Sequence, residues 1–149
     1  MQHVLLSIHV LAGIVFVGGS AVATSLFPRY APVADPEPGS PRNAAVAAAL
    51  HRITGGYALA GIIVPVVGIT LALVQGRMGE IWIAVAMVLT GLAAILLAAQ
   101  IHPRQREALK EPGEVRPLKR LAMLAGVYNL VWAVVVVLMI VRPGYTPAA

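Results

Sequence analysis

The sequence predicts an all-α protein, a four-helix transmembrane bundle. Of its 149 residues, 59% are hydrophobic and 11% are charged, whereas soluble domains carry about 25% charged residues. The apolar residues fall into four stretches, each long enough to cross a hydrocarbon core of about 30 Å. We therefore expect a single integral membrane domain over residues 1–149, in contact with the lipid bilayer, with spans at about 4–27, 53–75, 81–101 and 121–141.

Composition also excludes several classes of function. The chain contains no cysteine, so disulfides, cysteine-ligated iron–sulfur clusters and thiolate metal sites are excluded. The formal net charge is +5, but the basic residues cluster beside the predicted spans instead of forming a separate basic region. We therefore expect no nucleic acid among the partners of this chain.

The first span contains one histidine. His9 lies roughly 10 Å from the centre of this span, at a rise of about 1.5 Å per residue, and is therefore inside the hydrocarbon. Ionisable side chains at that depth are costly and usually face the bundle interior or a ligand. Three interpretations are open: a neutral imidazole that bonds to a neighbouring helix, a ligand of haem or another cofactor, or a relay for protons or ions.

The residues near His9 share one helical face. Steps of three and four residues place Gly13, Phe16, Ser20 and Thr24 on the same side of the helix as His9. Because this face has small and polar members, a flat cofactor or a closely packed helix fits against it. The sequence therefore allows either partner for the imidazole.

If the cofactor is haem, its second axial ligand must come from the same half of the membrane. Met87 and Met139 fall in that half, and methionine can serve with histidine at haem. No histidine in another predicted span matches the depth of His9, so a bis-histidine site needs a second copy or a partner protein. The candidate cofactor-binding residues are therefore His9, Gly13, Met87 and Met139, with His9 as the metal ligand.

Both ends of the chain resemble known families. The stretch from His9 to Gly19, followed by Pro28, resembles the first helix of small four-helix bacterial membrane proteins: the DUF2269 family, the copper-resistance CopD-type domain and the HemJ-type protoporphyrinogen oxidases. The last helix, from Val131 to Gly144, also resembles DUF2269. The resemblance implies a multi-pass protein of the bacterial inner membrane, and the matching histidine of HemJ-type proteins implies haem b at His9. HemJ-type proteins also use a lysine within a later helix, and this chain has no lysine in any predicted span.

The segment after the first span is a predicted loop that leads into a long helix. Prolines from Pro28 to Pro41 disfavour regular structure, and Ser40 followed by Pro41 is typical of an N-cap and a first helical residue. Pro65 predicts a kink within the second span. Small residues of this span are spaced so that another backbone can come close, in the same chain or in a second copy; they are Gly61, Gly68, Ala72 and Gly76.

A charged loop is predicted between the third and fourth spans. Pro103 is expected to end the third span, with His102 as the cap of its C-terminus, and residues 104–120 are expected to lie near the lipid headgroups. An alternative for His102 is a separate site shared with His51, because both lie at one level on successive helices. Near the middle of the fourth span, Asn129 is expected to bond across helices.

Basic residues predict the orientation. With four spans, both termini and the Gly76–Gly79 turn share one side, and the two long loops share the other. The side richer in Lys and Arg faces the cytoplasm, so both termini are expected on the non-cytoplasmic side. The termini side holds Arg77 and Arg142, and the loop side holds Arg29, Arg42, Arg52, Arg104, Arg106, Lys110, Arg116, Lys119 and Arg120.

These observations favour a small membrane protein that binds haem b through His9 and takes part in redox chemistry. The alternative is a non-catalytic accessory subunit of a larger membrane complex, because no other ionisable residue lies deep in a span and a coupled catalytic site usually needs more than one. A copper-transport module is a third hypothesis, weakened by the scattered methionines. The sequence leaves open whether the chain is an enzyme and whether it forms a homo-oligomer.

Overall fold

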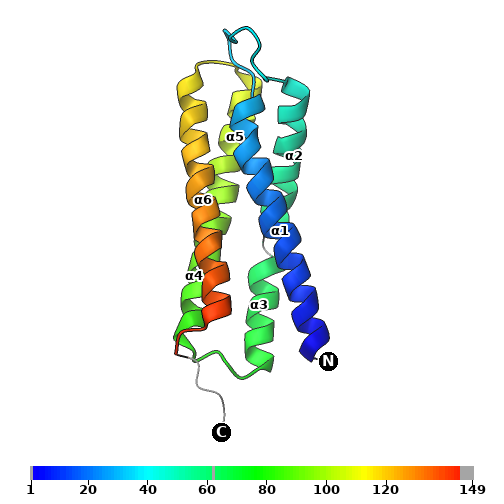
Figure 1. The fold of residues 1–149 in the computed structure, drawn as a ribbon, viewed down its shortest axis with the longest axis vertical. Coiled ribbons are helices and arrows are strands. Elements are labelled where there is room, and N and C mark those ends of the chain that lie inside the picture. The colour runs from blue at the N-terminus through cyan, green and yellow to red at the C-terminus, as the bar shows by residue number, and fades with distance from the viewer. Residues whose placement is uncertain (1, 62, 145–149) are drawn as a thin grey trace.

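The structure is a computed structural model that describes residues 2–61 and 63–144, and within these ranges every regular element is helical. The described helices form four rods, which lie side by side and run alternately up and down the bundle (Figure 1). Each rod is long and apolar enough to cross a membrane, as predicted. The elements are α1 (Gln2–Tyr30), α2 (Ala44–Ala60), α3 (Ile63–Val74), α4 (Ile81–Ile95), a π-helical segment (Leu96–Ile101), α5 (His102–Lys110) and α6 (Val115–Val141).

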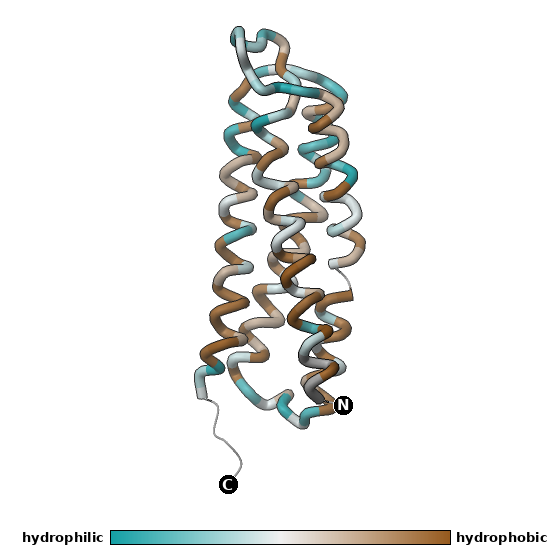
Figure 2. The backbone as a smooth tube through the Cα atoms, turned by 45° about the vertical axis from the view of Figure 1, so that its right-hand side comes forward, coloured by the Kyte–Doolittle hydropathy of each residue, from teal (hydrophilic) through white to brown (hydrophobic). Residues whose placement is uncertain are grey.

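The two ends of the bundle differ in composition. One end, which we term the loop end, carries the loop of residues 31–43 and the connection of residues 111–114. The opposite end, which we term the termini end, carries Gln2, the turn of residues 75–80 and Gly144. Hydrophilic residues gather at the loop end, and the rods below it are mostly apolar (Figure 2). The arrangement is that of a small multi-pass membrane protein.

The first helix continues past its predicted exit. Pro28 was expected to begin a loop, but α1 includes it and ends at Tyr30. The prediction was wrong because a distant residue supports the last turn. The Arg42 guanidinium donates hydrogen bonds to the carbonyl oxygens of Pro28 and Ala31, at 3.3 and 2.7 Å, and so satisfies acceptors at a helix end that otherwise lack partners.

The N-cap of the second rod is Asn43, and the prediction of Ser40 was wrong. The Asn43 side-chain oxygen accepts hydrogen bonds from the N–H groups of Ala45 and Val46, at 3.0 and 3.2 Å. The Asn43 N–H donates to the carbonyl oxygen of Tyr30 at 2.9 Å, which ties the start of α2 to the end of α1. Because Ser and Asn cap helices about equally well, only this tertiary contact selects between them.

The second rod comprises α2 and α3, on either side of residue 62, which lies outside the described residues. α2 ends at Ala60, and α3 begins at Ile63, two residues before the proline. A proline ring clashes with the carbonyl group four residues earlier, which for Pro65 belongs to Gly61; the kink at Pro65 stays a prediction. Gly61 is buried, and a Cβ there would lie 3.4 Å from the Phe16 ring, whereas a Cβ at Gly68 would meet nothing within 4 Å. Close packing within the chain is therefore present at Gly61 and absent at Gly68, where contact with a second copy stays a prediction.

The third rod runs on through Pro103, which was expected to end it. The π-helical segment makes this possible, because it widens the helix by one residue just before the proline. The His102 N–H donates to the carbonyl oxygen of Leu97, and Pro103 then falls in the first turn of α5, where its missing N–H costs little. Residues 104–110 of the predicted loop are therefore helical, and residues 111–114 connect α5 to α6.

Burial is uneven along the bundle. Side chains near the loop end, among them Phe27, Leu97 and Ile101, are at most 1% exposed. Near the termini end, α1 and α3 present large apolar side chains such as Leu11 and Val74 to the surroundings, which suits contact with lipid. The packed core that fixes the four rods therefore lies toward the loop end.

Candidate functional site

One face of α1 points into the bundle along the length of the helix. Its members toward the loop end are buried, and its two members near the termini end are half-buried, while Ile8 and Val10 beside them are exposed. The predicted shared face is therefore present. We refer to it as the inward stripe, and it consists of His9, Gly13, Phe16, Ser20 and Thr24.

Aromatic side chains cover the middle of the inward stripe. The Phe16 ring makes edge contacts with Tyr57 of α2 and Trp132 of α6, with ring centroids 5.5 and 5.6 Å apart. The Tyr128 hydroxyl of α6 donates a hydrogen bond to the Ser20 hydroxyl at 2.8 Å. These contacts close the stripe from Phe16 toward the loop end.

His9 and Gly13 lie beyond these contacts. Among the residues that the structure describes, none forms a hydrogen bond, ion pair or ring contact with His9. A Cβ at Gly13 would meet nothing within 4 Å. An unbonded polar group away from water costs about 1–3 kcal/mol.

Met139 is at the level of His9. α1 and α6 are antiparallel, and Phe16 contacts Trp132. His9 lies seven residues before Phe16 and Met139 lies seven residues after Trp132, so both are displaced by the same length toward the termini end. Met139 is half-buried against the core, and Met87 of α4 is also half-buried. Neither methionine forms a hydrogen bond with His9 within the described ranges.

Asn129 bonds across helices, as predicted. Its side-chain N–H donates to the Ser25 hydroxyl of α1 at 2.9 Å, and its side-chain oxygen has no hydrogen-bond partner within the described ranges. Together with the contact between Tyr128 and Ser20, this bond fastens α6 to α1. The role of Asn129 is therefore explained by packing within the chain.

A second histidine site lies near the loop end. The structure brings His51 of α2 against His102 of α5, with ring centroids 4.3 Å apart and an angle of 13° between the ring planes. The alternative of a shared site is therefore supported by geometry, and the predicted role of His102 as a helix-terminal cap was wrong because the helix continues beyond it. A Cβ at Gly55 would lie 2.8 Å from His102 Nε2, so the glycine makes room for this ring.

Gln105 completes the second site, and no sequence pattern pointed to it. Its side-chain oxygen lies 3.2 Å from His51 Nδ1, and the side chain is fully buried. If His51 Nδ1 carries the proton, it donates to this oxygen. Within the described ranges, the Gln105 side-chain nitrogen has no partner. Gln105 was overlooked because residues 104–120 were expected to be a loop, whereas on α5 it is one turn from His102.

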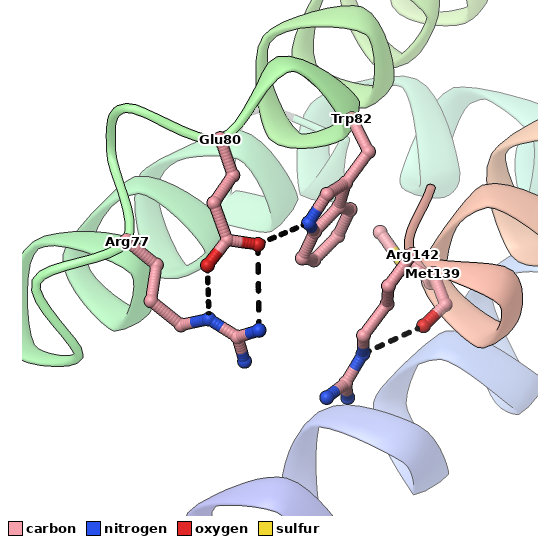
Figure 3. A network of polar contacts seen from close by, with 5 residues as sticks. All are labelled: Arg77, Glu80, Trp82, Met139 and Arg142. Carbon is pink, nitrogen blue, oxygen red and sulfur yellow. Dashed lines mark hydrogen bonds and ion pairs between the residues drawn. The ribbon is translucent and has the colours of Figure 1, made fainter. Parts of the chain in front are cut away.

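The turn at the termini end is held by a separate polar network (Figure 3). Arg77 forms a two-point ion pair with Glu80, at 2.6 and 3.3 Å, and the Trp82 indole N–H donates to the same carboxylate. The Arg77 guanidinium, and to a smaller extent the Trp82 hydrogen bond, hold the pKa of Glu80 below its ordinary value. Arg142 lies 5.9 Å from the Trp82 ring and donates to the Met139 carbonyl oxygen, so the network joins the turn to the end of α6.

The described part of the chain holds no group of three or more His, Cys, Asp or Glu side chains placed to bind a metal ion. Comparison with protein-family models, curated proteins and solved structures finds no significant match. The resemblance of both ends to DUF2269, CopD-type and HemJ-type proteins therefore stays a prediction.

Proposed function

We propose that this chain is a small membrane redox protein that binds haem b through His9. The observation that carries the proposal is an imidazole on the inward face of a membrane helix, with no partner among the described residues. A bond to iron would offset the desolvation of this group. The resemblance of the first helix to HemJ-type proteins points to the same cofactor.

The surroundings of His9 are compatible with a planar macrocycle. Gly13 leaves open space one turn along the inward stripe, and the nearby surfaces of α1 and α3 are apolar. Met139 is the favoured second ligand because it lies at the level of His9, and Met87 is the alternative. Haem b would supply one-electron transfer, and the chain would hold it away from water.

The accessory-subunit hypothesis rests on a different observation. The window of the second rod that is apolar enough to cross a membrane is only 12% buried within the chain, against 28% for the first and fourth rods. A surface this open along one rod suits a helix of a larger complex as well as lipid. In that case His9 would bond to a polar group of the partner.

We further propose that the protein resides in the bacterial inner membrane with its loop end in the cytoplasm. The support is the excess of basic residues at that end. Because the chain has no cysteine, single cysteines introduced at Gly113 and Gly79 can be labelled with a membrane-impermeant thiol reagent on intact cells. Labelling of Gly113→Cys, without labelling of Gly79→Cys, would reverse the orientation.

Absorbance spectra test the haem proposal. The full chain, purified in mild detergent from haem-replete bacterial membranes, should show a Soret band that shifts on reduction with dithionite. His9→Ala should abolish the band, and His102→Ala should leave it unchanged. Met139→Leu should alter the reduced spectrum, with Met87→Leu as its control; the opposite result would move the second ligand to α4.

The outcome also separates the two hypotheses. Wild-type protein without haem, both purified and in its native membrane, would overturn the cofactor proposal. Co-purification of colourless protein with a larger membrane complex, lost in His9→Ala but kept in His102→Ala, would support the accessory role instead.

A further inference from the structure

Two arginines lie next to the second histidine site along its helices. Arg52 follows His51 on α2, and Arg106 lies one helical turn beyond His102 on α5, where it is close enough to interact with that ring electrostatically. Both arginines are exposed, and neither forms an ion pair with a described residue. We refer to these residues as the loop-end cluster: His51, Arg52, His102, Gln105 and Arg106.

The loop-end cluster contains a hydrogen-bond donor that has no acceptor among the described residues. The Gln105 amide oxygen is engaged by His51, and its buried amide nitrogen is a donor with no partner in the described ranges. Guanidinium groups have donors only. Cationic surroundings and a surplus of donors disfavour a metal cation and favour an anion, and Arg recognises phosphate oxygens through its planar fork of N–H groups.

The parallel rings give a second reason to set a metal ion aside. A metal ion lies close to the plane of each imidazole that binds it, and two stacked rings 4.3 Å apart have no common plane. His102 Nε2 also faces the backbone of Gly55. An anion does not have to lie in the plane of either ring, because it can accept hydrogen bonds from donors on several sides.

The depth of the cluster identifies the source of the anion. Tyr57 contacts Phe16, which lies near the middle of the first span. His51 lies six residues before Tyr57, which is about 9 Å nearer the loop end. Arg106, one turn beyond the ring contact, reaches the edge of a hydrocarbon core whose half-thickness is about 15 Å. Lipid phosphates lie at this level, and basic pockets between membrane helices bind anionic headgroups.

We propose that the loop-end cluster binds the phosphate group of an anionic phospholipid headgroup. The arginines hold the phosphate at the membrane boundary, and the Gln105 amide N–H, which His51 positions, provides a donor beneath it. This inference concerns a different end of the bundle from His9 and does not depend on haem binding.

Short-chain lipids provide the test. Dioctanoyl phosphatidylglycerol is titrated into the full chain in an uncharged detergent and followed by calorimetry, in parallel with dioctanoyl phosphatidylcholine and with inorganic phosphate. Wild-type protein should bind phosphatidylglycerol saturably and the other two at least about tenfold more weakly. Equal binding of inorganic phosphate would overturn the assignment to a lipid headgroup, and equal binding of phosphatidylcholine would overturn selectivity for an anionic one.

Matched variants separate a specific site from general attraction to a charged surface. The double variant Arg52→Gln/Arg106→Gln should weaken phosphatidylglycerol binding by more than about tenfold. The control Arg116→Gln/Lys119→Gln removes the same charge from exposed residues at the start of α6 and should change binding by less than about twofold. Equal losses in both would overturn the proposal.

Gln105→Glu tests the buried donor with a change of one side-chain atom. A carboxylate there would replace the amide N–H with an acceptor and repel the phosphate, so binding should fall while the elution volume on a detergent column stays unchanged. Wild-type binding by this variant would count against a role for Gln105. If the variant failed to fold, the arginine pair and its control would still decide the outcome.

Discussion

At the loop end, His51 and His102 stack on each other and His51 meets the Gln105 amide, whereas His9 at the termini end has no partner among the described residues. The helices around the first two are closely packed, and those around His9 leave apolar surface exposed. The same residue type thus serves two purposes. Packing within the chain organises the loop-end site, whereas at the termini end we propose that haem supplies the partner of His9.

The glycines also differ in how closely other side chains approach them. A Cβ at Gly19 or Gly55 would collide with Tyr57 or His102, whereas a Cβ at Gly13 or Gly68 would meet nothing within 4 Å. The first two glycines are required by close approach between α1, α2 and α5. The other two are not required by contacts within the described chain, so their substitution should change the packing within that chain little.

Among the substitutions that test this contrast, Gly19→Ala should lower the free energy of unfolding most. The added Cβ would displace the Tyr57 ring from its contact with Phe16, and overpacking of this kind costs about 1–3 kcal/mol. Thermal unfolding in detergent, followed by circular dichroism, measures the loss. Gly18→Ala is the control, because its Cβ would meet nothing within 4 Å; equal destabilisation by the two neighbours would show that the α1–α2 contact is not tight.

Tyr128→Phe should destabilise the bundle by about 1 kcal/mol, the usual contribution of one hydrogen bond between helices. The variant removes the bond to Ser20 and keeps the ring packing. Tyr57→Phe is the control, because the Tyr57 hydroxyl has no hydrogen bond in the described ranges. The same unfolding assay compares them, and a larger loss in Tyr57→Phe would contradict the assigned fastening of α1 to α6.

Gly68→Ala should have the opposite sign and stabilise the protein by roughly 0.5–1 kcal/mol, because alanine is the better helix former and the space is open. Gly68→Leu should fold with little change in melting temperature. Smaller apparent size of Gly68→Leu on a detergent column would reveal a second copy at this face. Destabilisation by alanine in a protein of unchanged size would show that α3 packs more closely than the structure indicates.

Glu80→Gln should change the free energy of unfolding least. Because the pKa of Glu80 is lowered by Arg77, the ion pair contributes stability at neutral pH and loses it as pH falls through the lowered pKa of the carboxyl. The side chains are partly exposed, so the contribution is modest. Unfolding measured from about pH 7 to about pH 3, around the ordinary range of a Glu carboxyl, should show a slightly shallower acid dependence for the variant than for wild type.

The sequence by itself determined the class of fold and the inward-facing position of His9. Four apolar stretches of membrane length admit only helices that satisfy their own backbone hydrogen bonds, so the bundle followed from composition and spacing. The depth of His9 and the inward face that it shares with Gly13 and Phe16 followed from helical periodicity. The cross-helix role of Asn129 followed from the cost of a polar group in lipid.

Tertiary contacts decided the remaining features. Arg42 supports the last turn of α1 from the far side of a loop, and Asn43 caps α2 where Ser40 is an equally good cap in isolation. The π-helical segment lets the third rod pass Pro103 and turns Gln105 toward His51. Local propensity ranks such choices within about 1 kcal/mol of each other, so contacts between residues distant in sequence, which no local pattern records, select among them.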